Sequence, residues 1–141
     1  MNGKTIEKVA LICADGENGE KILFVRSHNK DKFYLPGGKI DPGETELEAL
    51  VREAREELSV ELRPDTVRRL GTISAQADGK ADGVTVRTTC YTAEFDGDPT
   101  PASEIAELAW LGKADADRLS ETGRLALEKL EKLKETTHGA F

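Results

Sequence analysis

Two stretches of this 141-residue chain repeat apolar residues at the three- and four-residue spacing of an amphipathic helix. The first covers residues 44–58, and its apolar stripe consists of Leu47, Leu50, Val51, Ala54 and Leu58. The second follows Ser120, whose hydroxyl suits an N-cap, and ends near Thr136. A helix with one apolar stripe has to bury that stripe against another layer of structure. We therefore expect each helix to cover one face of a sheet.

Around these helices the sequence predicts short strands separated by turns. β-Branched and apolar residues favour strands at residues 5–14, 21–26, 67–75 and 84–95, and a shorter strand around Ala109 and Trp110. The turn-rich residues 15–19 predict a hairpin between the first two strands, and residues 76–83 a polar hairpin loop. Hairpins argue against purely parallel pairing. We therefore expect an α/β layered fold with a mixed sheet between helices and with Trp110 in its core.

Length and composition fit a single globular domain spanning residues 1–141. A chain of this length buries about two-thirds of its unfolded surface, so its fold needs neither a disulfide nor a structural metal. Cys13 and Cys90 fall within predicted strands, with no CxxC pair and no neighbouring His. Isolated cysteines in such places usually behave as small core residues, so we expect buried, reduced thiols.

The chain is acidic, with 20 Lys and Arg against 27 Asp and Glu and a formal net charge of −7. Nucleic acid polymers and anionic lipid surfaces are bound through many cationic contacts, so both are disfavoured as partners. The longest uninterrupted apolar run, residues 9–14, is too short for a secretory core or a membrane span. We expect a cytoplasmic protein, either a monomer or a homodimer, that binds neither polymeric nucleic acid nor membrane.

Three glutamates gather on one face of the first helix. Glu53, Glu56 and Glu57 stand at i, i+3 and i+4. Like charges at this spacing repel one another, and a bound cation would neutralise them. The alternative is a solvated acidic face with Arg52 and Arg55 as counter-ions. Because no Cys or His lies nearby, the cation indicated is Mg²⁺, which prefers hard oxygen ligands and substrate phosphates.

A glycine-rich loop, residues 36–43, precedes this helix. Backbone N–H groups and a helix N-terminus attract phosphate, so loop and helix together indicate a metal–phosphate site. The loop is not a Walker A motif, because Glu44 and Thr45 stand where Lys and Ser or Thr are required. It does not match the dinucleotide-binding GxGxxG fingerprint either.

The spacing across loop and helix is more specific. Its 23 residues are Gly38, five residues, Glu44, seven residues and then Arg52-Glu53-Ala54-Arg55-Glu56-Glu57-Leu58-Ser59-Val60. This run resembles the Nudix box, the signature of the Nudix hydrolase family, and meets every charged position of that pattern. Ser59 departs from it, since the family usually has Gly there. The resemblance implies an α/β/α sandwich of the Nudix type with a mixed sheet between helices.

The resemblance also implies a metal site. Glu53, Glu56 and Glu57 would hold one or more Mg²⁺ ions, helped by the carbonyl of Gly37, with Mn²⁺ as a substitute. The implied reaction is metal-dependent hydrolysis of a nucleoside diphosphate linked to another group. Chemically this fits, because a metal lowers the pKa of water and neutralises charge on a leaving phosphate.

Other box residues acquire roles in the same way. Arg52 and Glu44 would pair and brace the loop against the helix. The implied catalytic residues are Glu53, Glu104 and Arg52. Glu53 is the first choice for the general base, and Glu104, six residues before Trp110, is the second. A solvated loop residue is the alternative for Glu104, and Glu107 is a weaker competitor.

Substrate contacts are expected from Gly38 and from Lys39, for which a solvent-facing lysine is the alternative. ADP-ribose hydrolases typically carry a Pro, and diadenosine polyphosphate hydrolases a Tyr, where this chain has Gln76 and Ala77. The short chain is similar to MutT-like nucleoside triphosphate pyrophosphohydrolases, which release a nucleoside monophosphate and pyrophosphate. The base pocket would include Phe33, Tyr34 or Gln76.

Two alternatives stay open. One is hydrolysis of ADP-ribose or dinucleoside polyphosphates. The other is a non-catalytic Nudix-like domain that binds a nucleotide as a sensor; loss of box carboxylates would mark it, and none is lost here.

Overall fold

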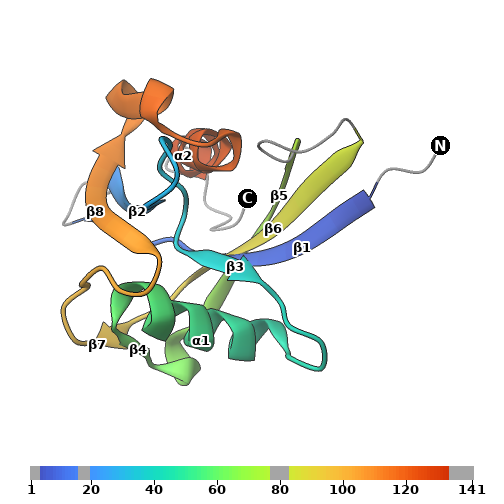
Figure 1. Ribbon diagram of the computed structural model, residues 1–141, viewed down its shortest axis with the longest axis vertical. Coiled ribbons are helices and arrows are strands. Elements are labelled where there is room, and N and C mark those ends of the chain that lie inside the picture. The colour runs from blue at the N-terminus through green and yellow to red at the C-terminus, as the bar shows by residue number, and fades with distance from the viewer. Residues whose placement is uncertain (1–3, 16–19, 77–82, 134–141) are drawn as a thin grey trace.

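The computed structural model describes residues 4–15, 20–76 and 83–133 of the chain. Most of the two predicted turns at 15–19 and 76–83, and the predicted helix end at Thr136, lie outside the described residues. The strands, helices and 3₁₀ turns follow in the order β1 (Lys4–Leu11), β2 (Lys21–Ser27), β3 (Gly37–Lys39), α1 (Glu46–Leu58), β4 (Glu61–Leu62), η1 (Pro64–Thr66), β5 (Arg68–Gln76), β6 (Val84–Thr92), β7 (Phe95–Asp96), β8 (Ile105–Gly112), η2 (Lys113–Arg118) and α2 (Glu121–Leu133) (Figure 1).

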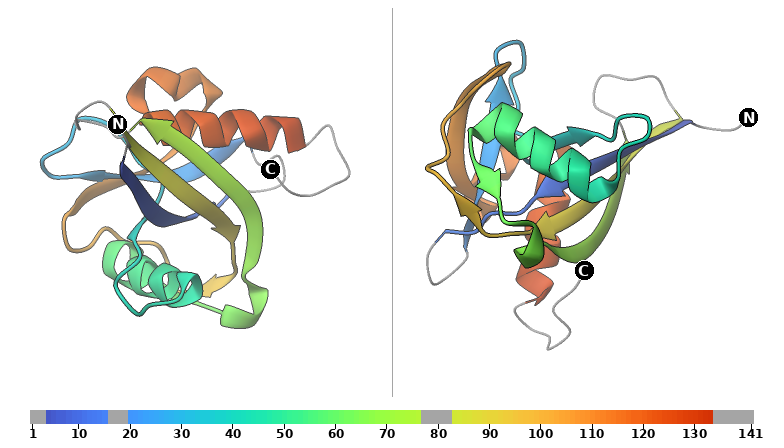
Figure 2. Two further views of the ribbon diagram at one scale, coloured as in Figure 1. Left: turned by 90° about the vertical axis from the view of Figure 1, so that its right-hand side faces the viewer. Right: turned by 90° about the horizontal axis from the view of Figure 1, so that it is seen from below.

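A four-stranded mixed sheet forms the middle layer of the fold. Its strand order is β3-β1-β6-β5, with β1 and β6 parallel and the other pairs antiparallel. The side view in Figure 2 shows α2 on one side of these strands and α1 on the other. Two further pairs, β2 with β8 and β4 with β7, lie beside this sheet. The expected α/β fold, with a mixed sheet between helices, is confirmed.

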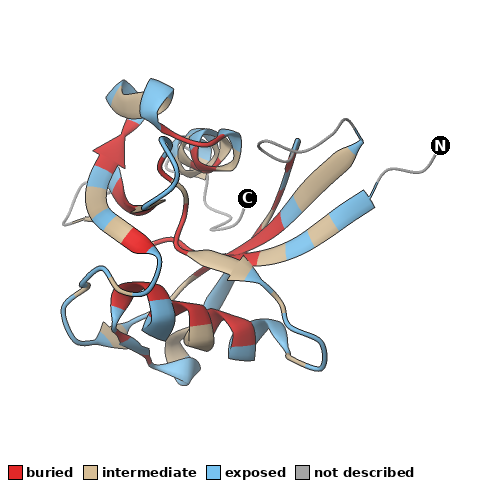
Figure 3. Ribbon diagram, in the orientation of Figure 1, coloured by how far each residue is buried: buried red, intermediate tan, exposed pale blue. Residues whose placement is uncertain are grey.

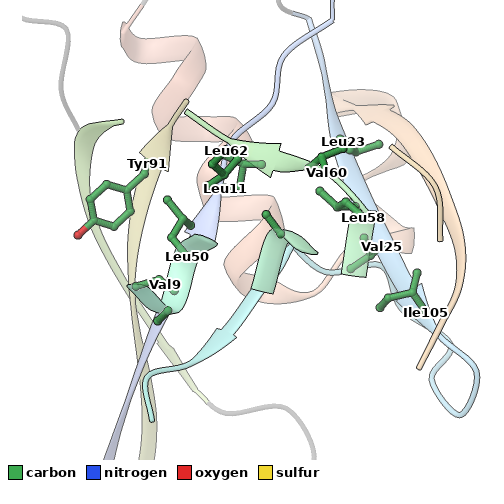
Figure 4. Close-up of a cluster of buried hydrophobic side chains, with 12 residues drawn as sticks. Val9, Leu11, Leu23, Val25, Leu50, Leu58, Val60, Leu62, Tyr91 and Ile105 are labelled. Carbon is green, nitrogen blue, oxygen red and sulfur yellow. The ribbon is translucent and has the colours of Figure 1, made fainter. Parts of the chain in front are cut away.

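Strand β1 contributes side chains to two hydrophobic cores. Val9 and Leu11 point to the core beneath α1, which Figure 4 shows, whereas Ala10 and Ile12 belong to the core beneath α2. This division follows from the alternation of side chains along a strand. Figure 3 shows buried segments, in red, where β1 and β6 pass between the helices, and also on α1 and β8. The position of β1 therefore fixes both helices relative to the sheet.

Helix α1 begins two residues later than predicted. Thr45 is its N-cap, and Thr45 and Glu48 form a capping box in which each side chain accepts from the other's backbone N–H. The helix ends at Ser59, whose φ of 58° is left-handed. Glycine would adopt this conformation without strain, so Ser59 keeps the geometry at some cost.

Helix α2 begins as predicted. The Ser120 hydroxyl accepts a 3.1 Å hydrogen bond from the Gly123 N–H, and the Ser120 carbonyl accepts from Arg124. No helix within the described ranges is long and apolar enough to cross a membrane.

The predicted hairpin between the first two strands is largely wrong. Among the described residues, only its end next to the turn forms, through a bridge between Ala14 and Ile22 and hydrogen bonds from the Leu23 N–H to the Cys13 carbonyl and from the Asp15 N–H to the Lys21 carbonyl. Beyond that point β1 pairs with β6 and β3, whereas β2 pairs with β8. The two strands separate because they serve different sheets, which is a long-range outcome that a local turn signal does not contain.

Other expectations also need correction. Trp110 is 42% exposed on β8 rather than in the core, and Leu47 is 39% exposed rather than part of the buried stripe of α1. The strand expected around Ala109 extends over all of β8, and β3 forms within the predicted glycine loop. Both cysteines are free; Cys90 is buried in β6, whereas Cys13 is half-buried just beyond β1.

Candidate active site

Two of the three clustered glutamates point inward from α1. Glu53 and Glu57 are buried, with relative exposures of 9% and 6%, whereas the Glu56 side chain is 48% exposed. One helical turn separates Glu53 from Glu57, so both lie on the same face, toward β3. The sequence placed all three on one face; the structure separates a buried pair from an exposed third.

Glycines in β3 make room for the buried pair. The Gly37 N–H donates a 2.8 Å hydrogen bond to Glu57 Oε1. A Cβ atom at Gly37 would overlap the Val9 carbonyl oxygen, and one at Gly38 would overlap the Glu53 carboxylate. The φ of Gly37, 147°, is also one that side chains rarely allow. Glycine at 37 therefore lets β3 lie against β1, and glycine at 38 lets the Glu53 carboxylate keep its position over the strand.

Arg52 joins the loop to the helix. It donates two hydrogen bonds to Glu44, from Nε to Oε2 at 2.8 Å and from Nη2 to Oε1 at 3.0 Å. Its Nη2 also donates to the Lys39 carbonyl at 3.0 Å, and its Nη1 to Glu53 Oε1 at 3.1 Å. A fork of this kind fixes two planar groups relative to each other. These hydrogen bonds lower the pKa of Glu44 to about 2.

Glu56 is held by the same guanidinium. Arg52 Nη1 lies 3.3 Å from Glu56 Oε1 and 3.4 Å from Oε2. Arg52 thus contacts Glu44, Glu53 and Glu56, and it orients the box without lining the adjacent cleft.

Burial and mutual repulsion make the charged forms of the two buried carboxylates unfavourable. Burial raises the pKa of Glu57 to about 8, and repulsion from Glu53 and Glu104 adds to this, whereas the Gly37 hydrogen bond opposes it. Burial also raises the pKa of Glu53 to about 7, opposed by Arg52 and reinforced by Glu56 and Glu104. Carboxylates held together away from water favour either a proton or a cation between them.

A cleft of about 390 Å³ opens beside these carboxylates. Glu53, Glu57 and Glu104 line it together with Gly37 and Gly38. Glu104 reaches it from the loop before β8. Glu56 is not among the lining residues, and Glu107 instead pairs with Arg26 at 2.7 Å.

The other walls of the cleft come from the sheet and from α2. Lys39, Tyr34 and Gln76 line it, and so does the start of α2 at Ser120, Glu121 and Thr122. Phe33 does not line it, because this ring is buried against the second core beneath the guanidinium of Arg118. Of the three residues expected in a base pocket, Tyr34 and Gln76 therefore line the cleft and Phe33 does not.

Lys8 is a cleft residue that sequence reasoning missed. It lies on β1, directly opposite Lys39 on β3, and both lysines line the cleft. Burial and the nearby Lys39 lower the pKa of Lys8. The signal was a charged residue within an otherwise apolar run on one face of β1, between Ile6 and Ala10.

The chemistry of the site fits a divalent cation. It offers carboxylate and carbonyl oxygens, the ligand type that Mg²⁺ prefers, and Mg²⁺ commonly keeps several waters and takes substrate phosphates as ligands. Among the described residues, no group of three acidic, Cys or His side chains forms a complete metal site. The buried, mutually repelling Glu53 and Glu57 are the part of the site that a cation would stabilise.

The family model described as the NUDIX domain matches residues 5–133 of this chain. Among curated proteins, the human 8-oxo-dGDP phosphatase NUDT18 is 35% identical over 51 residues, which are 34% of this chain and 16% of that protein. The chain thus matches only a small part of the length of this relative.

Solved structures match over nearly the whole chain. The solution structure of the E. coli ORF135 protein is 28% identical, with a TM-score of 0.71, covering 94% of this chain and 92% of that one. The MutT protein from Methanosarcina mazei Go1 has a TM-score of 0.73 at 20% identity, covering 96% of this chain and 99% of that one, and it supports the fold alone.

Proposed function

Because this chain belongs to the Nudix family, as the family match over residues 5–133 shows, we propose that it is a MutT-like, magnesium-dependent pyrophosphohydrolase. Nudix hydrolases are enzymes that act on nucleoside diphosphate derivatives and generally use divalent metal ions. The substrate we propose is a nucleoside triphosphate, hydrolysed to a nucleoside monophosphate and pyrophosphate. One observation carries this proposal: Glu53 and Glu57, buried and mutually repelling, line one cleft with two obligatory glycines.

Glu53, Glu56 and Glu57, with the carbonyl of Gly37, would hold the metal. When bound, a divalent cation neutralises charge on the phosphates and lowers the pKa of the attacking water. The chain's own residues do the rest of the positioning. Arg52 keeps Glu53 oriented at 3.1 Å and fixes the loop through Glu44.

The general base takes a proton from water as that water attacks phosphorus. We propose Glu53 first, because its carboxylate lies over Gly38 at the cleft wall. Glu104 is the second candidate, since it lines the same cleft and is close enough to raise the pKa of Glu53. Measuring kcat against pH for Glu53→Gln and Glu104→Gln distinguishes the two candidates. In the variant that has lost the general base, kcat no longer falls at low pH through protonation of that base.

Gly38 and Lys39 would contact the phosphates, and Tyr34 and Gln76 the nucleoside, because all four line the cleft. The short match to an 8-oxo-dGDP phosphatase is a reason to test oxidised nucleotides beside ordinary ones. Hydrolysis of ADP-ribose or dinucleoside polyphosphates is the second candidate activity. A cytoplasmic location and a monomer or homodimer remain parts of the proposal. So does a preference for small nucleotides over polymers, which the charge of −7 supports.

The test is product analysis with purified protein and Mg²⁺. The panel contains the canonical dNTPs, 8-oxo-dGTP, 8-oxo-dGDP, ADP-ribose and a dinucleoside tetraphosphate. We expect nucleoside monophosphate and pyrophosphate from at least one triphosphate, and no turnover after metal removal with EDTA. Tight nucleotide binding with no turnover of any compound would instead support the sensor alternative.

Glu57→Gln provides the matching variant. The amide oxygen can still accept from the Gly37 N–H, so the fold is kept while a metal-ligand charge is lost. We expect turnover to fall by at least about a hundredfold. Glu128→Gln, an exposed change on α2, is the control and keeps the parent rate. Parent-like turnover in Glu57→Gln would show that the metal assignment is wrong.

A further inference from the structure

Two lysines face each other across adjacent strands at the cleft. Lys8 on β1 and Lys39 on β3 are direct antiparallel partners, so their side chains point to the same face of the sheet. Both line the cleft, where Lys8 is half-buried and Lys39 is exposed. Like charges directly opposite each other destabilise a strand pair. The sheet keeps this arrangement beside the buried carboxylates of α1, which indicates a use for the two charges.

The described part of the chain does not neutralise Lys8. Glu53 and Glu57 attract it electrostatically, yet neither carboxylate forms an ion pair with it among the described residues. Fully buried lysines almost always have such a partner, and Lys8, which is half-buried, has none among the described residues. The missing counter-charge is therefore one that a ligand in the cleft can supply.

Register fixes where that ligand group would lie. Ala10 pairs with Gly37, whose N–H holds Glu57, so the carboxylate end of the cleft lies at Ala10. Lys8 lies two residues from Ala10 toward the N-terminus of β1, and Ile6, which pairs with Val86, lies two residues beyond Lys8 in the same direction. With two residues of strand spanning about 7 Å, Lys8 separates the carboxylates from the more apolar part of the cleft.

We propose that Lys8 binds the substrate phosphate that lies between the carboxylates and the nucleoside, and so positions the nucleotide. The inference rests on the proposed function, because it assumes that phosphates enter this cleft. An ammonium group at this depth binds a phosphate oxygen as a point charge. Lys8 sets the affinity for the nucleotide and its position along the cleft, and it takes no part in the chemical step.

The test compares Lys8→Met, which keeps most of the length and loses the charge, with Lys8→Arg, which keeps the charge. For Lys8→Met we expect KM for the best triphosphate to rise by at least about tenfold, the effect of losing one charged hydrogen bond. We expect kcat to stay within about threefold. Lys8→Arg should restore most of the affinity. Lys4→Met is the control, since Lys4 is exposed on the same face of β1 and does not line the cleft.

Binding of the two reaction products, measured without turnover, shows which phosphate Lys8 contacts. Calorimetric titration of the nucleoside monophosphate and of inorganic pyrophosphate, with and without Mg²⁺, separates the two product sites. We expect Lys8→Met to weaken the binding of the nucleoside monophosphate by about tenfold and the binding of pyrophosphate by less than about twofold. Its melting temperature should be unchanged or higher, because the repulsion with Lys39 is removed.

The outcomes are distinguishable. If the parent protein hydrolyses nucleotides and Lys8→Met keeps the parent KM and monophosphate affinity, the role of Lys8 is wrong and the proposed function stands. Weakened pyrophosphate binding with unchanged monophosphate binding also overturns it. If the parent protein neither binds nor hydrolyses any nucleotide, both the proposed function and the role of Lys8 are wrong.

Discussion

The backbone N–H of Gly37 donates a 2.8 Å hydrogen bond to Glu57 Oε1. This contact joins the first residue of β3 to the last turn of α1, at the carboxylate end of the cleft. It is made to a carboxylate whose pKa burial raises to about 8, so the site holds a charge that the folded chain alone does not stabilise well.

Glu57→Gln should stabilise the metal-free protein at alkaline pH. The folded-state pKa of Glu57, about 8, is above its ordinary value of 4.5, so the folded protein binds this proton more tightly than the unfolded chain. The resulting stability is present below about pH 4.5 and is lost as pH rises through 8. At pH 9 in EDTA, urea unfolding should show Glu57→Gln more stable than the parent by at least about 1 kcal/mol. Saturating Mg²⁺ should raise the free energy of unfolding of the parent but not that of Glu57→Gln. If Glu57→Gln is less stable than the parent at pH 9 in EDTA, this account is wrong.

The Glu44 carboxylate should make stability depend on pH in the opposite direction. Arg52 lowers its folded pKa to about 2, below the ordinary 4.5. Its contribution is therefore present above pH 4.5 and is lost as pH falls toward 2. The difference in urea midpoint between the parent and Glu44→Gln should be largest near pH 6 and should close in acid. Glu128→Gln should show no such gap, and a gap that is constant with pH would mean that charge is not its source.

Gly38→Ala should damage activity more than stability. The added Cβ would overlap the Glu53 carboxylate, which has to move away from its position over β3. A small displacement of a catalytic group costs on the order of tenfold to a hundredfold in kcat. Gly43→Ala is the contrasting variant, since its Cβ meets nothing within 4 Å but its φ of 82° is left-handed. Gly43→Ala should cost about 1 kcal/mol of stability and leave kcat unchanged; the reverse pattern would refute this assignment.

Ser59→Gly should stabilise the fold. Ser59 caps α1 with a φ of 58°, and its N–H donates to the Arg55 carbonyl at 3.1 Å, so the left-handed turn is part of the helix end. Glycine removes the side-chain strain, and we expect a gain of about 0.5–1 kcal/mol in urea unfolding. Ser59→Ala should give no gain, because alanine is strained there as well. A loss on Ser59→Gly would mean that the serine side chain contributes an interaction of its own.

Local spacing predicted the parts of the site that depend on one helix and the loop before it. The eight-residue separation of Glu44 and Arg52 allows the observed fork, and the four-residue step from Glu53 to Glu57 puts both on one face. The same reasoning could not separate Glu56, because its exposure depends on where β3 lies against α1.

The pairing of strands that lie far apart in the chain could not be predicted from local sequence patterns. Lys8 becomes a site residue only because β3 pairs with β1, and three residues of a glycine loop give little strand signal. Trp110 was expected in the core, yet it is 42% exposed on β8, which pairs only with β2 among the described strands. Aromatic character indicates burial only on average, whereas sheet order decides it residue by residue.

Strand β1 has side chains in both cores, Val9 and Leu11 in one and Ala10 and Ile12 in the other. A one-residue shift in its register would exchange every side chain between the two cores and would turn Lys8 away from the cleft. The two halves of the structure therefore cannot lose order independently, and backbone amides on both sides of β1 should exchange with solvent in a single cooperative opening. The register of one strand therefore determines both how the two cores pack and whether Lys8 faces the cleft.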